Sequence, residues 1–353
     1  MPPLSNVEMP PVNGPNSETK MDGIESRIVE SISNHLSPIT ERTSLIKSTK
    51  SKPNVVYHYL DHSNWKIMWT NVIFFALLHL VHFYGLYLMF IRNHNKAWVL
   101  CYVYGSWGAL GVTAGAHRLW SHRSYKAKLP LRIFLMLGHT ISAQNSLYVW
   151  CRDHRSHHKF SETDGDPHNS KRGFFFAHMG WLLFKKHPEI FQKGKSLDLS
   201  DLLEDPVVRF QKKFYWPLIF TFSMALPTII GIYVCEETLI MSFLITVIGR
   251  LVTSLHSTWF VNSTAHMFGY RPYNLKISPR ENIFVSYGAF GEGYHNYHHT
   301  FPWDYATSEL GYSFNTTKHF IDFMAKIGLA YDLKVADRNL VERYKKSVGK
   351  ECH

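Results

Sequence analysis

HRLWSH (117–122), HRSHH (154–158) and HNYHH (295–299) decide how this chain of 353 residues is interpreted. Each of these three clusters borders a long apolar stretch, and together they supply eight of the 22 histidines. Neutral imidazole is the commonest protein ligand of transition metals. Solvated or core histidines explain one such cluster but explain three poorly. The pattern therefore predicts a metal centre at the surface of a membrane.

Composition narrows the class of protein and its partners. The length allows two soluble domains, or one membrane domain with cytosolic parts. A mean hydropathy of -0.16 fits a few spans that carry a large polar cap. The net charge of +11 favours anionic partners, such as lipid headgroups, phosphate-bearing substrates or an acidic protein. The chain has no recognised nucleic-acid-binding motif, so we expect no nucleic acid partner.

Hydropathy divides the chain into tails, spans and a cap. Residues 1–52 are polar and predict a disordered cytosolic tail, residues 53–335 a membrane domain, and residues 336–353 a C-terminal tail. A membrane helix needs about 20 apolar residues. Four stretches approach this length, at about 68–91, 98–116, 216–235 and 239–261. Since the short links between them hold few cations, the positive-inside rule places both termini and the cap (117–213 and 262–335) in the cytosol.

Two apolar segments carry polar residues. The segment 129–150 includes Arg132 and His139, so we expect it to lie along the interface or to pack inside the cap. Arg250 and His256 lie within the fourth stretch. Polar groups at that depth face protein or a cavity, which indicates an interior site.

Spacing suggests how the histidines are arranged. Residues three and four apart share a helix face, so HRSHH and HNYHH each direct three rings to one side. In HRLWSH, His117 and His122 are five apart, about 140° on an ideal helix. These two bind different ions, or they lie where the second span unwinds. Asn262 and His266, just past the fourth stretch, are further contributors.

Nine imidazoles are too many for one ion, which favours two metals. Zinc accepts histidine but offers no redox chemistry. Arg152, Lys185 and Lys186 suit the phosphates of an anionic substrate whose apolar tail lies in a cavity between the spans, or else they contact headgroups.

Longer motifs surround the clusters and carry a family resemblance. They are AGAHRLWSHRSYKA (114–127), RDHRSHHKFSET (152–163), DPHNSKRGFFF (166–176), GYRPYNLKISPREN (269–282) and GEGYHNYHHTFPWDY (291–305). With them the chain resembles the animal acyl-CoA desaturases of the stearoyl-CoA desaturase type, over residues from about 64 to 333.

The resemblance implies an all-α membrane protein of the endoplasmic reticulum. It would have four transmembrane helices, both termini in the cytosol, and a helical cytosolic cap that holds two Fe ions. The implied iron ligands are His117, His122, His154, His157, His158, His266, His295, His298 and His299, with Asn262 acting through water. The implied contacts to acyl-CoA are Asn71, Asn145, Arg152, Asp153, Lys185, Lys186 and Trp259. Lys185 stands where the family pattern leads us to expect arginine, which replaces a bidentate contact by a point charge.

The implied reaction introduces a cis double bond into a saturated long-chain acyl-CoA, at Δ9 or Δ11. It consumes O₂ and two electrons, which come from cytochrome b5 and its reductase. A hydroxylase or acetylenase with the same di-iron site is an alternative. A histidine-rich membrane metal transporter is an alternative from another class, although its ligands would lie at mid-bilayer rather than at the ends of spans.

Gly105 and Ala109 lie one turn apart in the second stretch, where the family's substrate tunnel ends. We expect a bulky aromatic residue at the Gly105 position in vertebrate relatives. The small residues here predict a tunnel that is longer or differently ended. Trp107 refilling the space is the alternative.

Overall fold

The structure, a computed structural model, describes residues 66–91, 94–309 and 314–351. Within these residues the protein is helical, apart from one short antiparallel ladder of β1 (Lys126–Ala127) with β2 (Ala330–Tyr331). The predicted tail 1–52 lies outside the described residues. Residues 338–351 of the predicted C-terminal tail form helix α17 (Arg338–Glu351).

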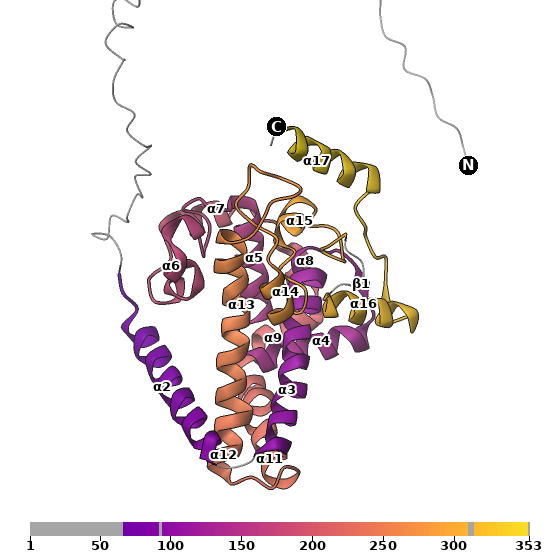
Figure 1. Ribbon diagram of the computed structural model, residues 1–353. Coiled ribbons are helices and arrows are strands. Elements are labelled where there is room, and N and C mark those ends of the chain that lie inside the picture. Colours follow the sequence, from indigo (N-terminus) through magenta and orange to yellow (C-terminus); the bar gives the residue numbers. More distant parts are fainter. Residues whose placement is uncertain (1–65, 92–93, 310–313, 352–353) are drawn as a thin grey trace, which may run out of the picture. The chain divides into compact units, whose positions relative to one another are not determined.

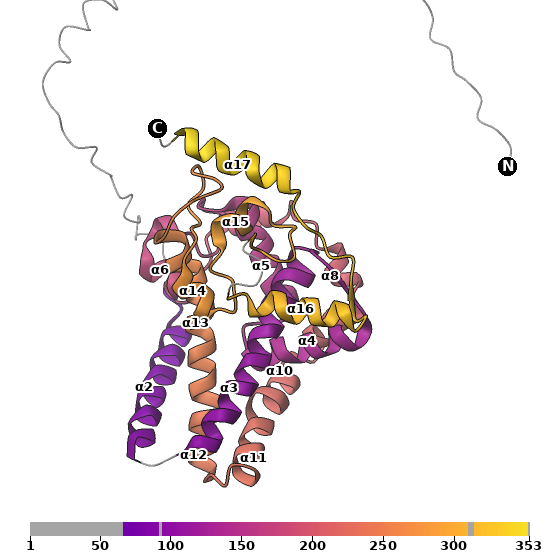
Figure 2. The same cartoon turned by 45° about the vertical axis from the view of Figure 1, so that its right-hand side comes forward.

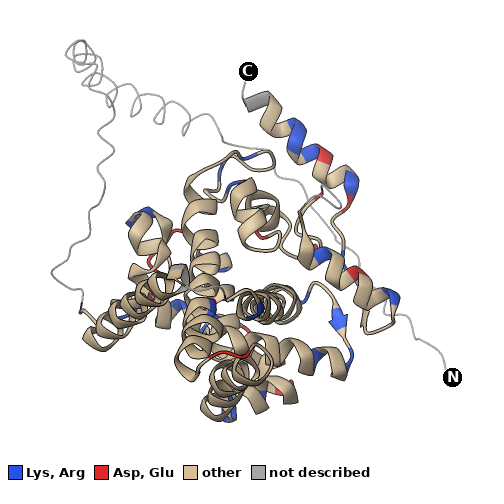
Figure 3. Ribbon diagram, turned by 60° about the horizontal axis from the view of Figure 1, so that its bottom comes forward, with Lys and Arg blue, Asp and Glu red and all other residues tan. Residues whose placement is uncertain are grey.

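Among the described residues, three helices are long and apolar enough to cross a membrane. They are α2 (Trp69–Ile91), the continuous run of α10 (Tyr215–Leu218), η5 (Ile219–Ala225) and α11 (Leu226–Tyr233), and the run of α12 (Leu239–Phe243), η6 (Leu244–Gly249) and α13 (Arg250–Met267). They extend together from the end that carries the shorter helices (Figures 1 and 2). Figure 3 shows that charged residues are sparse along them, as membrane segments require.

The stretch predicted as the second span is helical but is not one of these three. It forms α3 (Asn95–Leu110) and then η2 (Gly111–Ser121). Tyrosine, tryptophan and glycine residues lower the hydropathy of α3, and every residue of η2 is buried in the protein. The structure therefore supports three spans by length and composition.

The segment 129–150 packs inside the protein, one of the two places expected for it. Helix α4 (Leu129–Ser142) lies against α3 and η2. A Cβ on Gly111 would fall 2.0 Å from the backbone nitrogen of His139, so only glycine allows the two backbones to approach this closely. His139 itself is fully buried and points to no metal cluster.

Arg250, at the start of α13, is held entirely by oxygens of other segments and of its own helix. Its side chain is 2% exposed. It donates to the carbonyl oxygens of Thr246, Ile141 and Ser223, and to the Ser223 hydroxyl. A cation buried inside an apolar helix bundle must have hydrogen-bond acceptors for its N–H groups, and here backbone carbonyl oxygens are most of those acceptors.

The cap consists of short helices that surround the end of η2. They are α5 (Leu147–Phe160), η3 (Ser170–Arg172), α6 (Phe174–His178), η4 (Gly180–Leu182), α7 (Pro188–Gly194), α8 (Ser200–Glu204), α9 (Pro206–Lys213), α14 (Ile283–Gly288), α15 (His295–Thr300) and α16 (Thr316–Lys326). The largest apolar core lies among η2, α4, α5, α9 and α16, with Leu135 and Leu147 fully buried in it. This core fixes the helices that carry the first two histidine clusters.

Replacing Gly111 with alanine will destabilise the protein. The added methyl group collides with the α4 backbone, and overpacking of this kind costs roughly 1 to 3 kcal/mol. The midpoint of thermal unfolding in detergent measures the effect. Gly105→Ala in α3 is the control, because the nearest neighbour of its Cβ would be the Arg250 Cγ at 3.6 Å, an ordinary contact distance. Equal midpoints for the two variants would contradict the close contact.

Candidate metal centre

The nine predicted histidines converge in two groups. One group joins η2, α5 and α15, and the other joins α5, α13 and α15. The first contains His117, His122, His154, His158 and His298, and the second contains His157, His266, His295 and His299. Within each group the nitrogens that face one another lie within 4.8 Å. The division into five and four matches the expectation of two metal positions.

The facing atoms are mostly Nε2 atoms at short distances. His122 and His154 are 2.8 Å apart, and His117 and His298 are 2.9 Å apart. In the second group the Nε2 of His295 is 3.0 Å from that of His266 and 3.1 Å from that of His299. Neighbouring ligand atoms around one ion have separations of this size when each lies about 2.1 Å from the metal.

His117 and His122 belong to the same group, so the expectation that they bind different ions is wrong. The reason is the helix type. The backbone N–H of His122 donates to the carbonyl of His117 at 3.1 Å, which closes an i,i+5 turn of a π-helix. In such a turn, residues five apart lie above one another instead of 140° apart. The wide helix thus directs both rings to one point without unwinding.

Helix α5 contributes to both groups. Its N-terminus is capped by the Ser146 hydroxyl, which accepts from the N–H of Val149. His154 and His158, four residues apart, face the first group, and His157 faces the second. The three rings share one side of the helix, as predicted, but they divide between two centres.

A buried carboxylate orients one ring of the first group. The Nδ1 of His117 lies 2.9 Å from Glu292 Oε2. Arg118, fully buried, donates to Glu292 Oε1 from Nε and Nη2. Burial alone would raise the pKa of Glu292, but Arg118 and His117 hold it below the usual value. As an ionised acceptor, Glu292 fixes the tautomer of His117 whose Nε2 lone pair faces the group. Gly291, at φ 102°, turns the chain into this position.

A second carboxylate does the same for the other group. Asp166 Oδ1 accepts from His157 Nδ1 at 2.9 Å, and His168 Nδ1 lies 3.7 Å from the same oxygen. Although burial would raise its pKa, these imidazoles hold the Asp166 carboxyl below its usual value. Each group therefore contains one ring that is fixed by an acid.

The imidazoles fit a metal cation. Burial and then neighbouring rings lower the pKa of six of these histidines well below the usual value, so the rings are neutral. These are His122, His154, His158, His295, His298 and His299. Lone pairs that face each other repel unless a cation lies between them, and an all-nitrogen set suits iron, zinc or copper.

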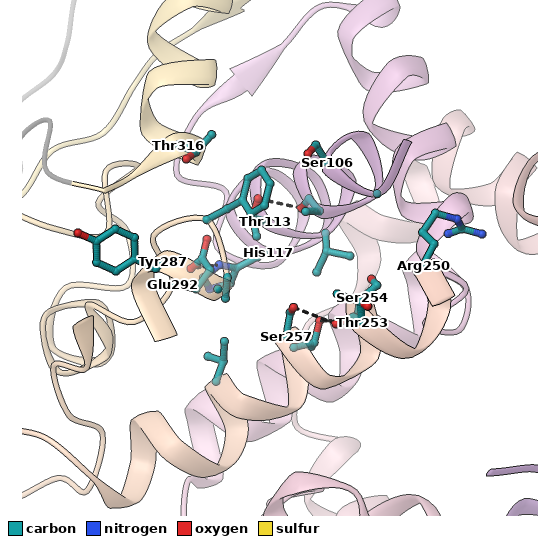
Figure 4. Close-up of a pocket in the computed structure, with 18 of the residues that line it drawn as sticks. Ser106, Thr113, His117, Arg250, Thr253, Ser254, Ser257, Tyr287, Glu292 and Thr316 are labelled. Atoms are coloured by element: carbon teal, nitrogen blue, oxygen red, sulfur yellow. Dashed lines mark hydrogen bonds and ion pairs between the residues drawn. The ribbon is translucent and has the colours of Figure 1, made fainter. Parts of the chain in front are cut away.

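A cavity of about 480 Å³ connects this centre to the helices below it. It lies between α3 with η2 on one side and α13 with α14 on the other, and His117, His154, His157 and His295 form part of its wall. Figure 4 shows His117 and Glu292 near one end and Arg250 at the other. The cavity thus contacts residues of both groups.

The small residues predicted at the end of a tunnel line this cavity. Gly105 and Ala109 are both in its wall, which continues past them to Cys101 and Trp98. Trp107 faces α4 instead, where its Nε1 donates to the Phe134 carbonyl at 3.0 Å and its ring stacks on that residue. Trp107 therefore does not refill the space, and this alternative is wrong. Asn262 also lines the cavity, beside the second group.

The predicted acyl-CoA residues lie at several places. Asp153 accepts from Arg152 and from the Lys186 ammonium, so these three are brought together. Lys185 is exposed next to them in the chain. Asn71 on α2 donates to the carbonyl of Leu182, just before this segment.

Asn145 and Trp259 stand apart from that cluster. Asn145 is exposed in the link between α4 and α5. The Trp259 ring is 2% exposed and packs between α2 and α6, with centroids 5.6 Å from Phe75 and 5.7 Å from His178. Trp259 is not among the residues that line the cavity.

Comparison with known proteins identifies the family. Residues 93–323 match the family model described as fatty acid desaturase. The chain is 52% identical to a stearoyl-CoA desaturase of Bos taurus over 287 residues, which are 81% of this chain and 79% of that protein. It is 50% identical to an acyl-CoA Delta-9 desaturase of Acheta domesticus over 289 residues, 82% of this chain and 80% of that protein. The chain belongs to the fatty acid desaturase family.

Sequence reasoning missed the residues that orient the ligands in this desaturase family member. In the sequence Glu292 is only one letter of the GEGYHNYHHTFPWDY motif, whereas in space it holds His117. Asp166 and His168 lie in the DPH sequence that follows the second cluster. A carboxylate close to a histidine cluster in the sequence could have indicated these residues. Imidazoles that bind a metal through one nitrogen commonly donate the N–H of the other nitrogen to an acid.

Replacing the orienting acids will weaken one metal position each. We expect Glu292→Gln to weaken binding at the five-histidine group, and Asp166→Asn at the four-histidine group, by roughly 10- to 100-fold. Chelator titration followed by mass spectrometry of bound metal per chain gives the measurement. Glu189→Gln and Asp332→Asn, at exposed ion pairs, are the matched controls. Two ions retained as firmly as in the unmodified protein would refute the orienting role.

Proposed function

We propose that this protein is an acyl-CoA desaturase that introduces a cis double bond into a saturated long-chain acyl-CoA. The observation that carries the proposal is the shared wall between the two imidazole groups and the cavity. A long apolar substrate in that cavity lies directly beside both metal positions. The names of the similar proteins, stearoyl-CoA and acyl-CoA desaturases, support the same activity.

In this proposal the two groups hold two Fe ions. The ligands are the nine histidines of the two groups, and Asn262 acts through water on the four-histidine side. Iron supplies the redox chemistry with O₂ that removal of hydrogen from an unactivated methylene requires. All-nitrogen donation also suits zinc, which lacks that chemistry.

The protein's own residues position the substrate and exclude water from the reacting carbons. Adjacent methylenes are chemically alike, so the double-bond position, Δ9 or Δ11, depends on which carbons the cavity wall holds beside the ions. The buried groups Glu292 and Asp166 keep His117 and His157 oriented in the absence of substrate. The apolar part of the cavity wall around the chain also keeps bulk water away from the reacting carbons.

The polar end of the substrate is assigned to the cations around Asp153, which lies on α5 between the cavity-lining residues Trp150 and His154. Arg152 and Lys186 are positioned by Asp153, and Lys185 is exposed beside them, so the three cations suit the phosphates of coenzyme A. Asn71, Asn145 and Trp259 complete the proposed set of contacts. Trp259 acts from its buried place by supporting α13, which carries Asn262.

The proposal includes the location and the electron donor. Four helices would cross the endoplasmic reticulum membrane, with α3 as the fourth span and both termini in the cytosol. Cytochrome b5 and its reductase would deliver the electrons. Support comes from the three apolar helices and from the grouping of the histidines at one end of them.

A hydroxylase or acetylenase would use the same centre, and the product decides among them. A membrane metal transporter would place its ligands along the spans. The metal groups instead draw on η2, α5 and α15 beyond the spans, with His266 near the end of α13.

Expression in a yeast strain without its own desaturase will restore unsaturated lipids. Mass spectrometry of the fatty acids should show a loss of two hydrogens and not a gain of oxygen, and it locates the double bond. His157→Ala should abolish the product while leaving protein in the membrane, because the four-histidine group loses the ligand that Asp166 orients. His82→Ala, a histidine outside both groups, is the control. Full turnover by His157→Ala would contradict the ligand assignment.

Gly105→Tyr should shift the substrate preference to shorter chains. The nearest atom to a Cβ at Gly105 is 3.6 Å away, so the ring would enter the cavity and shorten it. Competition among acyl-CoAs of different length measures the preference. Gly194→Tyr, where a Cβ meets nothing within 4 Å, serves as the control. An unchanged product profile would defeat the role of Gly105 in limiting the chain.

A further inference from the structure

A second pocket, of about 460 Å³, opens beside the five-histidine group. It is shallower and more open than the substrate cavity. Its wall consists of Ser121, His122, Arg123, Arg155, Lys159, Ser196, Leu197, Asp198, Pro302 and Trp303. Nothing in the proposed reaction described so far uses this pocket.

The pocket lies where the outer sides of all three histidine motifs meet. Arg123 directly follows HRLWSH, and Arg155 and Lys159 lie on α5 between and after the histidines of HRSHH. Pro302 and Trp303 come shortly after HNYHH. Each motif therefore presents ligands to the interior and a second set of residues to this pocket.

His122 belongs to both surfaces. The residue is part of the pocket wall, and its Nε2 lies 2.8 Å from His154 Nε2 inside the five-histidine group. His122 therefore contacts both the pocket and the metal position. A redox partner seated here would have a short path, through a conjugated ring, to the ion.

The charges around the pocket are mainly positive. Arg155 is anchored by Asp201, and Arg123, with 49% of its side chain exposed, contacts Asp201 and Asp198. The Lys159 ammonium is held by the carbonyl and hydroxyl oxygens of Ser196, and it meets no carboxylate among the residues that the structure describes.

Three cations of the pocket wall, Arg123, Arg155 and Lys159, therefore face the carboxylates of Asp198 and the neighbouring Asp201, a positive balance that attracts an acidic partner.

An exposed aromatic ring completes the surface. Trp303 is 40% exposed, while Phe301, whose ring lies 6.0 Å from it, is buried and anchors the segment. Tryptophan and arginine are enriched among the residues that dominate binding energy at protein interfaces. Ten residues line the pocket, and a surface of this extent suits a brief encounter, since electron-transfer complexes commonly bury less than about 1,200 Å².

We propose that this pocket is the docking surface for the acidic electron-donor protein, and that His122 is the ligand through which electrons reach the five-histidine ion. The inference rests on the proposed desaturase function. Each encounter would oxidise one ferrous haem of the donor and deliver one electron to the centre that the five histidines would hold. Two encounters, one O₂, two protons and the two hydrogens of the acyl chain give the double bond and two water molecules.

The direct test measures binding of the soluble haem domain of cytochrome b5 to the full chain in nanodiscs. Lys159→Glu and Trp303→Ala should each raise the dissociation constant by roughly tenfold. Lys326→Glu, the same charge change at the end of α16 and outside the pocket wall, should leave it unchanged. Metal-free protein should show the same differences, because the surface and not the ion is tested. Rising ionic strength should weaken binding of the unmodified chain more than that of Lys159→Glu.

A second measurement separates this inference from the function on which it rests. Stopped-flow oxidation of the reduced haem domain, with stearoyl-CoA and O₂ present, should slow in both pocket variants. Their turnover with dithionite as a chemical reductant should match that of the unmodified chain. Equal donor binding by Lys159→Glu, Trp303→Ala and the unmodified chain would overturn the docking surface alone. A lack of substrate-dependent donor oxidation by the unmodified chain would overturn the desaturase function and the docking inference together.

Discussion

The buried contacts that Glu292 makes with Arg118 and with His117 are the constraint on which the centre depends. Nine imidazoles from separate segments must point their ring nitrogens at two places, an arrangement that is unfavourable without a cation. Arg118 gives the Glu292 carboxylate the partner that burial demands, and Glu292 fixes the ring of His117. Since Arg118 also donates to the carbonyl of Tyr305, the same contact joins the first histidine motif to the segment that follows the third.

Helix geometry explains how this arrangement is reached. The i,i+5 turn from His117 to His122 aligns two ligands that an α-helix would separate. The close approach of Gly111 to α4 holds that wide helix against its neighbour. Small residues and an unusual hydrogen-bond register thus place the ligands, while the apolar core beneath them supplies stability.

The sequence was sufficient to predict the histidines that gather in two groups, the family and three of the spans, because these follow from motif content and long apolar runs. It was not sufficient for features that depend on packing. That His117 and His122 face the same group could not be predicted without knowing that they lie on a π-helix. The orientation of Trp107 toward α4 depends on the Phe134 carbonyl, a partner 27 residues away. The roles of Glu292 and Asp166 also arise only when distant segments meet.

Arg250 has a consequence for the biogenesis of the protein. Its guanidinium finds acceptors on Ile141 and Ser223, in segments that are synthesised before it. Until those carbonyls are gathered, the last apolar helix carries an uncompensated cation into lipid, which opposes its insertion. The helix should therefore leave the translocon only alongside the earlier part of the chain, so that integration and tertiary assembly become one event.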